Sequence, residues 1–493
     1  MRLMREKDLG IYKETRRRGI TIWPLVRPNH DSFQGICQVM SSHSSADVPQ
    51  NFQYISRIES LMDPAGNILL NMSCEEASAR VLSGDAGKVA EIDGQFAICV
   101  AEGKKVRMAR SIGRPMRYFL AKKSDGPCLI VAEQIQDIRN KLGELGLEDQ
   151  FHPSYTRMVP AHYVVELELI GCPDPNPVYT RYFQPPRNRW SKDLDAIGEK
   201  YIGKVVQECD RWLDRLDPKE PIGVLFSGGI DSGTIFLVLN HLLLRRGEAP
   251  QRLKAFTLSI DSSSSDCKQA HEFVKRSGLE MLWEVIDLPS SSLDWRAAVR
   301  VTEDYKPLDI QAATMGLALC QGIRARYPDW KVLVDGDGGD ENLKDYPIEE
   351  NPELTIRSVL NNLMLYQEGW GVHAIKHSLV YSGGQSRGHI RTWAPAKHFG
   401  FQGFSPFALP RVIEIAEGIP FIELTDWKHD LLYGLKGEVV SRGVRGVLGV
   451  ELPLFTKRRF QHGAVSETTF QSLFPRHEAA YRRELLTHFL RDG

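Results

Sequence analysis

A short apolar strand that runs into a glycine-rich turn and then directly into an apolar helix most constrains how this chain can fold. It occupies Pro221–Leu239, with the sequence PIGVLFSGGIDSGTIFLVL. Gly228 and Gly229 have no Cβ, so the backbone can bend tightly and its N–H groups can converge on an anion. The helix that begins near Asp231 points its positive end at the same place. The segment therefore predicts a binding loop for phosphate or pyrophosphate.

The polar side chains of this loop suit the same ligand. Ser227 and Ser232 add hydroxyl donors, and Asp231 can hold Mg²⁺ that is bound to the phosphates. The GxxxxGK[ST] pattern is absent, which disfavours a kinase or GTPase. The alternative is an ordinary strand–helix turn in which Asp231 caps the helix.

A second strand and glycine-rich turn follow about a hundred residues later, at Lys331–Asn342. Clustered carboxylates repel one another, so they are tolerated in solvent or around a cation. In a parallel sheet both turns would lie at the carboxyl ends of strands, where open α/β folds bind ligands. We therefore expect a shared Mg²⁺ site, with a solvated loop as the alternative. The carboxylates of this turn belong to Asp335, Asp337, Asp340 and Glu341.

The pattern along the chain divides it into two domains, at residues 1–185 and 190–493. Short apolar runs separated by polar residues predict a sheet-rich N-terminal domain, and the proline-rich segment 171–191 predicts a linker. After it, strand-like and helix-like runs alternate, which predicts a parallel α/β sheet covered by helices. From about residue 351 the spacing becomes mainly helical. The strands are expected at 96–101, 106–110, 128–133, 222–226, 253–258 and 332–334, and the helices at 193–213, 233–244, 267–277 and 310–327.

Composition narrows the class of protein. The formal net charge of −1 is balanced along the chain, so no nucleic-acid partner is expected. No run of about eighteen apolar residues is present, and the N-terminal residues lack the apolar core of a secretory signal. The eight cysteines form no CxxC pair, which disfavours a zinc site or a disulfide framework. A cytoplasmic protein without a membrane partner is expected.

Taken together, these motifs resemble the asparagine synthetase family of N-type ATP pyrophosphatases, over most of the chain. The resemblance implies an N-terminal Ntn-hydrolase-like αββα sandwich followed by an α/β ATP-pyrophosphatase domain with a parallel sheet and a helical C-terminal part. One motif departs from the family, because Ala408 and Leu409 replace its Leu-Asp pair. The matching segments are Ser227–Ser232 (SGGxDS), Asp335–Glu341 (an SGEGSDE-type loop), Phe401–Pro420 (G-x-E-x-R-x-PFLD…ALxIP) and Leu452–Gly463 (LP…K-x-x-F-x-x-G).

The resemblance also implies a role for particular residues. Asp231 and Asp340 would hold Mg²⁺, and Lys457 would be the active-site lysine. Asp337 would take part in the acylation step, and Glu368 is a weaker candidate for the general base. The ATP contacts would come from Ser227, Gly228, Gly229, Asp231 and Ser232 at the pyrophosphate, Leu225, Leu258 and Gly336 near the adenosine, and Lys428 at the phosphates.

The implied chemistry gives these roles a reason. A substrate carboxylate attacks the α-phosphate of ATP, and Mg²⁺ with Lys457 would stabilise the charge that develops there. After pyrophosphate leaves, an amine attacks the acyl-adenylate and AMP departs. For Lys457 the alternative is one cation within a solvated Lys-Arg-Arg run.

The expected partners are a small-molecule or peptide carboxylate and an amine. Whether the protein forms a homodimer is left undecided. Residues 351–404 are expected to line much of the substrate pocket. Their aromatic and histidine side chains could recognise a substrate, although such residues in a helical region are more often core or surface residues: Trp370, His373, His377, Tyr381 and Trp393.

The N-terminal segment Ile92–Leu120 is similar to the family's glutaminase domain, whose nucleophile is a cysteine at residue 2. Arg2 stands at that position here, so glutamine is not expected as the nitrogen source. The same loss occurs in β-lactam synthetase, carbapenam synthetase and lasso-peptide cyclases, which favours an amide-forming or ring-closing ligase of specialised metabolism. The acidic Asp337 instead favours an ammonia-dependent asparagine synthetase. A catalytically idle nucleotide-binding scaffold and a tRNA-modifying adenylase are the remaining alternatives.

Overall fold

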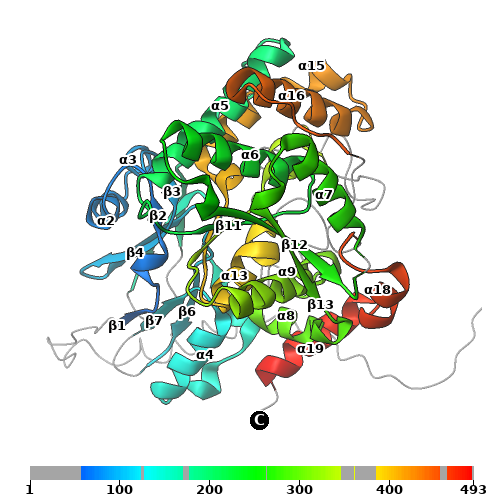
Figure 1. Cartoon of the computed structure of the whole chain (residues 1–493). Helices are drawn as coiled ribbons and strands as arrows, with labels where there is room; N and C mark the ends of the chain where they lie inside the picture. Colours follow the sequence, from blue (N-terminus) through cyan, green and yellow to red (C-terminus); the bar gives the residue numbers. More distant parts are fainter. Residues whose placement is uncertain are drawn as a thin grey trace, which may run out of the picture. The chain divides into compact units, whose positions relative to one another are not determined.

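A parallel sheet of five strands, in the order β13-β12-β11-β14-β15, forms the centre of the C-terminal part (Figure 1). The computed structural model describes residues 57–123, 127–169, 177–262, 264–345, 360, 385–455 and 463–490, all within one compact unit, Tyr54–Gly493. The strands are β11 (Ile222–Leu225), β12 (Leu253–Ile260), β13 (Trp283–Leu288), β14 (Val332–Val334) and β15 (Gln402–Phe404).

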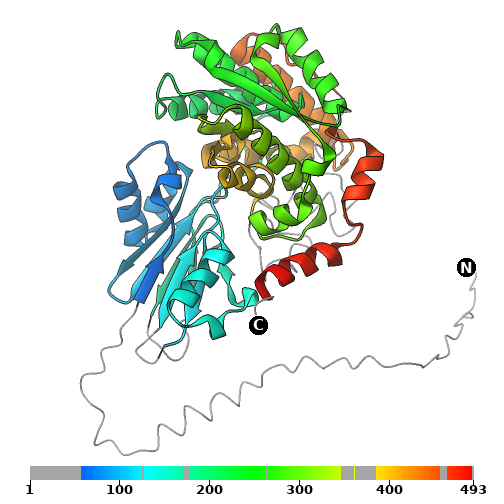
Figure 2. The same ribbon diagram turned by 60° about the horizontal axis from the view of Figure 1, so that its bottom comes forward.

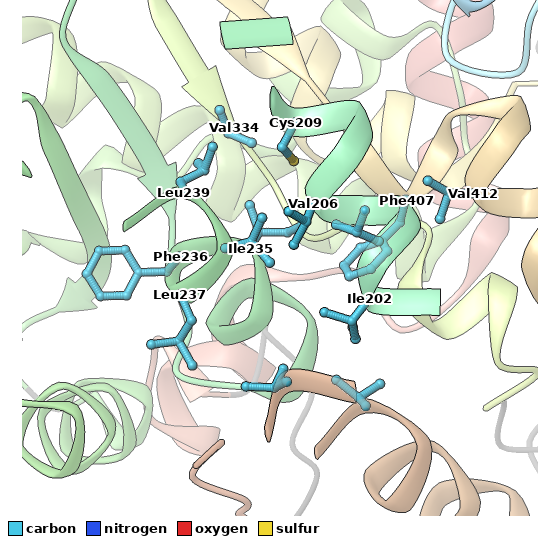
Figure 3. Close-up of a cluster of buried hydrophobic side chains, with 14 of the residues drawn as sticks. Ile202, Val206, Cys209, Ile235, Phe236, Leu237, Leu239, Val334, Phe407 and Val412 are labelled. Atoms are coloured by element: carbon cyan, nitrogen blue, oxygen red, sulfur yellow. The ribbon is translucent and has the colours of Figure 1, made fainter. Parts of the chain in front are cut away.

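Both faces of this sheet are buried. Successive side chains of a strand point to opposite faces, and helices cover each face. On one face, Ile222, Val224 and Val334 join a large cluster with α5 (Leu194–Leu213) and α6 (Ile230–Arg245), part of which Figure 3 shows. On the other, Phe256 and Leu333 pack with side chains of α9 (Pro307–Arg326). Burial on both faces explains why these strands are nearly continuous apolar runs in the sequence.

Most of the expected elements of the C-terminal part are present, with small shifts at their ends. Helices α5, α6, α7 (Ser265–Ser277) and α9 and strands β11, β12 and β14 overlap the predicted ranges. Asp193 caps α5 by accepting from the N–H groups of its first turn, which is why the helix begins there.

Two strands lie in segments for which the pattern predicts no strand. Strand β15 is a short strand in the region expected to be mainly helical, and its three residues, of which Gly403 is one, carry no strand signal of their own. Strand β10 (Val178–Arg181) lies in the predicted linker and pairs antiparallel with β9 (Tyr163–Glu168). Pairing with another strand decided both segments, and a local pattern does not record it.

The remaining helices of the C-terminal part cover the sheet and extend the chain beyond it. They are α8 (Trp295–Thr302), α10 (Gly339–Asn342), a π-helix at His389–Trp393, α13 (Ala394–His398), α14 (Pro410–Glu417), α15 (Phe421–Thr425), α16 (Leu431–Leu448), α18 (Glu467–Leu473) and α19 (Glu478–Leu490). Among the helices in the described part of the chain, none has the length and apolar composition needed to cross a membrane.

The N-terminal part contains two four-stranded sheets, visible in blue and cyan in Figure 2, with orders β1-β7-β6-β8 and β10-β9-β5-β4. One apolar cluster joins the two sheets face to face, with Met108 and Val165 from one and Leu129 and Val131 from the other. Helices cover the outer faces, giving a helix–sheet–sheet–helix order of layers. The elements are β1 (Arg57–Ser60), β4 (Ala97–Glu102), β5 (Lys105–Arg110), β6 (Arg117–Ala121), β7 (Cys128–Ala132), β8 (Arg157–Met158), α2 (Cys74–Ser83), α3 (Ala86–Ala90) and α4 (Ile135–Glu144).

The two parts are joined by buried polar contacts. Glu303, just after α8, accepts the backbone N–H groups of Ile135 at 2.7 Å and Gln136 at 2.8 Å, so it caps α4 from the other part of the chain. Arg211 of α5 donates to Asp93 at 2.6 Å. Such bonds fix the N-terminal part against α5 and against the end of α8.

Candidate functional site

The loop Ser227–Ser232 lies between β11 and the N-terminus of α6, as the sequence predicts. Gly228 has φ 72°, a left-handed conformation that favours glycine, and a Cβ there would lie 2.8 Å from the backbone of Ala270. Gly229 is the N-cap of α6 and has no side chain to cap the helix. The first N–H groups of this 16-residue helix therefore remain available to an anion.

Hydroxyl groups shape the interior of this loop. The Ser227 N–H donates to Ser232 Oγ at 3.2 Å, and the two hydroxyl oxygens are 3.2 Å apart. The Gly229 N–H lies 3.4 Å from Ser227 Oγ. Both hydroxyls therefore face the turn rather than the apolar core, where each can donate to a phosphate oxygen.

The acidic loop after β14 lies against the first loop. A Cβ at Gly336 would lie 2.6 Å from the backbone nitrogen of Ser232, and a Cβ at Gly339 would overlap the carboxylate of Asp231. The contact arises because β11 and β14 are neighbouring parallel strands, so their carboxyl ends meet at one edge. Two motifs about a hundred residues apart in the sequence thus form one site.

A lysine bridges the two loops. Lys436 of α16 donates from Nζ to Asp231 Oδ2 at 2.6 Å and to Asp340 Oδ1 at 2.5 Å, and Asp345 Oδ2 is 3.9 Å away. Its side chain is 2% exposed. Burial lowers the pKa of Lys436, but Asp231, Asp340 and Asp345 outweigh burial and hold it well above its usual value. Lys436 is thus a fixed positive charge between the two loops.

Sequence reasoning missed Lys436, although a signal existed. Its neighbours on the buried side of α16 are Leu432, Val439 and Val440. A lysine in this apolar stripe has to find a buried anion, because an unpaired ammonium in the core is too costly. The pattern therefore indicates that Lys436 has a buried anionic partner, but it does not identify the partner residue.

The donor chemistry of Asp231 and Asp340 fits Mg²⁺. Their carboxylates meet at one ammonium, so their oxygens already converge on a cation. The described residues contain no group of three or more His, Cys, Asp or Glu side chains that could hold a metal alone. Mg²⁺ typically takes one or two carboxylates, which Asp231 and Asp340 can supply, and completes its shell with water and substrate phosphates.

Asp335 and Asp337 form a second, deeper carboxyl pair in the acidic loop. The Thr392 hydroxyl lies 2.7 Å from Oδ2 of each. Asp335 also accepts from Ser405 Oγ at 2.9 Å and from the Asp337 N–H at 3.0 Å. Burial and the neighbouring Asp337 raise the pKa of Asp335 well above its usual value. Burial raises the pKa of Asp337 to about 6, opposed by the nearby Arg391.

Two of the predicted catalytic residues, Lys457 and Glu368, lie outside the described residues, so their roles stay predictions. The chain is anchored on both sides of the segment 456–462. Tyr433 Oη donates to the carbonyl of Phe455 at 2.6 Å, and Ser264 Oγ donates to the carbonyl of Gly463 at 3.0 Å.

Lys428 lies at the surface rather than beside the two loops. Its side chain is 62% exposed, and Asp426 is its ion-pair partner at 3.8 Å. A contact with the phosphates therefore stays a prediction for Lys428, whereas Lys436 touches acidic residues of both loops.

The three residues predicted near adenosine lie at the carboxyl edge of the sheet. Leu225 is the last residue of β11, and Leu258 lies near the end of β12 with its side chain buried. Gly336 packs on Ser232. Among the predicted pocket residues, the described part contains Trp393, which is buried beside Lys397, as a core residue would be.

A known protein family matches the part of the chain that contains the candidate site. Residues 213–392 match the family model described as asparagine synthase, and this range includes both loops and Thr392. Amidase chry2 of Gibberella zeae is 25% identical over 171 residues, which cover 32% of this chain. That alignment spans 24% of the relative, so the chain matches about a quarter of its length. The family match supports ATP-dependent amide ligation.

Proposed function

We propose that this protein is an ATP-dependent ligase that adenylates a substrate carboxylate, releases pyrophosphate, and then joins the acyl group to an amine with release of AMP. One observation carries the proposal. The hydroxyl-lined loop at the N-terminus of α6 packs on the acidic loop, so that an anion site and a carboxylate pair lie side by side.

The loop would bind the β- and γ-phosphates, which leave as pyrophosphate. Its N–H groups and the hydroxyls of Ser227 and Ser232 would orient them and stabilise the negative charge that gathers as the bond from the α-phosphorus to its bridging oxygen breaks. Asp231 and Asp340 would hold Mg²⁺, which would neutralise phosphate charge. Lys436 keeps these two carboxylates together before ATP arrives.

In the second half-reaction the amine has to lose a proton as its nitrogen bonds to the acyl carbon. Asp337 is suited to accept that proton, because a carboxyl with a pKa of about 6 is mostly ionised at neutral pH yet is more basic than an exposed aspartate. Lys457 would stabilise the oxyanion of the tetrahedral intermediate before AMP leaves. Glu368 is a second candidate for the base.

The N-terminal sheets are proposed to be a glutaminase-like scaffold that does not hydrolyse glutamine. A glutaminase of this family needs a cysteine thiol as its nucleophile. In the described part, burial raises the pKa of the Cys99 thiol to about 12 and raises the pKa values of Cys209, Cys267 and Cys320 as well. A protonated thiol is a poor nucleophile, so these four cysteines are unsuited to that role.

Two candidate reactions share this chemistry. One is an amide-forming ligase of specialised metabolism, with the amine on the substrate itself or on a second molecule, and the raised pKa values of the four thiols support it. An ammonia-dependent asparagine synthetase is favoured by the acidic residue at position 337.

The test is release of pyrophosphate and AMP from Mg-ATP with a panel of carboxylic acids, each with and without ammonia, glutamine or candidate amines. Release with aspartate that ammonia accelerates identifies the asparagine synthetase. Release with an amino acid that needs no added nitrogen identifies ring closure. Tight ATP binding with no release across a broad panel would favour the idle scaffold and count against the ligase.

A further inference from the structure

The Thr392 hydroxyl is placed where it has more acceptors than protons. It lies 2.7 Å from Asp335 Oδ2, 2.7 Å from Asp337 Oδ2 and 3.0 Å from the carbonyl of Gly388. A hydroxyl has one proton to donate. Two contacts of 2.7 Å between oxygens need two protons, so at least one of the two carboxyls has to carry the second.

The surroundings of the two carboxyls decide which one is protonated. Asp335 is 3% exposed, and its polar contacts are the neutral groups Thr392, Ser405 and the Asp337 N–H. Asp337 is less buried and lies near the guanidinium of Arg391. Burial without a cation favours the neutral acid at Asp335, and the guanidinium favours the anion at Asp337.

We propose that Asp335 is a neutral acid that donates to Thr392, and that Thr392 in turn donates to the Asp337 carboxylate, so that both position Asp337 as the proton acceptor for the amine. The inference deepens the proposed function and rests on it for the role of Asp337. The SGEGSDE-type loop that Asp335–Glu341 resembles begins with serine, so the acid at position 335 distinguishes this chain.

The backbone supports a fixed geometry for this chain of hydrogen bonds. Thr392 lies in the π-helix His389–Trp393, an irregularity that is frequent at functional sites. A Cβ at Gly388 would lie 2.8 Å from Cβ of Asp337, so glycine allows this helix to approach the acidic loop closely. The position of Thr392 is therefore set by backbone packing as well as by its hydroxyl.

Other charged groups also face Asp337, and they have to be kept constant in any test. Arg391 comes from the π-helix, and Asp340 and Glu341 come from α10. Asp309 of α9 pairs with Arg391 at 3.1 Å. None of these groups is altered in the variants below.

The first experiment needs no substrate. Infrared spectra of protein labelled with ¹³C-aspartate are recorded at pH 7.5 for wild type, Asp335→Asn and Asp337→Asn. The wild type and Asp337→Asn should show a protonated carboxyl band that Asp335→Asn lacks. Identical bands in wild type and Asp335→Asn would overturn the assignment of the proton, whatever reaction the protein catalyses.

The second experiment follows the complete reaction with the substrate pair found in the panel. Asp335→Asn can still donate to Thr392 and should lose far less turnover than Asp337→Asn, which should lose at least about 100-fold, as expected for a lost general base. Equal losses in the two variants would contradict a neutral Asp335.

Thr392 provides a matched pair for the same assay. Thr392→Ser keeps the hydroxyl, and Thr392→Val keeps the shape but removes the donor. Thr392→Val should move the acid limb of the pH profile for amide formation upward by about one pH unit, while Thr392→Ser should leave it in place. An unmoved limb in Thr392→Val would show that the threonine is only structural.

Discussion

The ammonium of Lys436 lies 2.6 Å from Oδ2 of Asp231, with Asp340 on its other side at 2.5 Å. The lysine and the first carboxylate are more than two hundred residues apart in the sequence, and their contact ties α16 to the N-terminus of α6. This contact holds the two loops of the candidate site together in the absence of a ligand.

Replacing Lys436 by methionine should therefore destabilise the protein. The change removes an ammonium that contacts three carboxylates, and we expect the free energy of unfolding to fall by about 3 kcal/mol, the lower end for breaking a buried ion pair, because Asp231 and Asp340 are partly exposed. Urea unfolding measures it. Lys428→Met, at the surface, is the control and should change stability by less than about 0.5 kcal/mol. Equal effects of the two substitutions would contradict the assignment.

The same variant should respond more strongly to Mg²⁺ than wild type does. Without the ammonium, Asp231 and Asp340 retain their convergent oxygens, and a divalent cation can take its place. Unfolding curves with and without Mg²⁺ should show a larger stabilisation of Lys436→Met. No difference from wild type would argue against a metal site at these two carboxylates.

The contact between the two loops can be tested through Gly336. A Cβ there would lie 2.6 Å from the backbone nitrogen of Ser232, so Gly336→Ala should push the loops apart and weaken Mg-ATP binding at least about tenfold, a cost of about 1.4 kcal/mol. Calorimetric titration measures the affinity. In Gly434→Ala the new methyl meets no atom within 4 Å, and this helical substitution should leave binding unchanged. Unchanged affinity in Gly336→Ala would show that the contact between the two loops does not contribute to ATP binding.

Lys457 should be required for amide formation, whereas its neighbour in the cationic run should not. Lys457→Ala should reduce turnover by at least about 100-fold, as expected for loss of a group that stabilises developing negative charge. The measurement is AMP release with the substrate pair identified in the panel. Arg459→Ala removes one charge from the same run and should retain activity within a few-fold. Normal turnover in Lys457→Ala would overturn its assignment.

Stability should depend on pH through Glu208, which lies at the contact between the two parts of the chain. Burial and the neighbouring Asp93 raise the pKa of Glu208 to about 7, against the pairing with Arg211 and Lys204. The folded state then binds the proton more tightly than the unfolded state, for which the value is 4.5. Its stabilising contribution is full below pH 4.5 and is lost as the pH rises through 7.

Wild type should therefore be less stable at pH 8.5 than at pH 5.5, by on the order of 1–3 kcal/mol from this group. Glu208→Gln cannot ionise and should lose that difference. Urea unfolding of both proteins at the two pH values provides the measurement, and equal pH dependence would show that Glu208 does not titrate in this window.

Local sequence patterns account for the helix ends, the strand before the first loop and the two loops themselves. Asp193 caps α5, the apolar run before Ser227 becomes β11, and Gly228 adopts the left-handed conformation that the turn requires. These outcomes depend on the steric and hydrogen-bonding preferences of neighbouring residues, so a pattern in the sequence records them. The expectation that the two loops meet also followed, because parallel strands bring their carboxyl ends to one edge.

Packing between distant segments, by contrast, selects the side chains that complete the site. Lys436 reaches Asp231 because α16 packs on α5 and α6. Thr392 reaches Asp335 and Asp337 because a π-helix without a sequence signature approaches the acidic loop. Strand β15 likewise exists because it pairs with β14. In each case the deciding energy comes from burial and pairing between segments far apart in the chain, and no local preference contains that information.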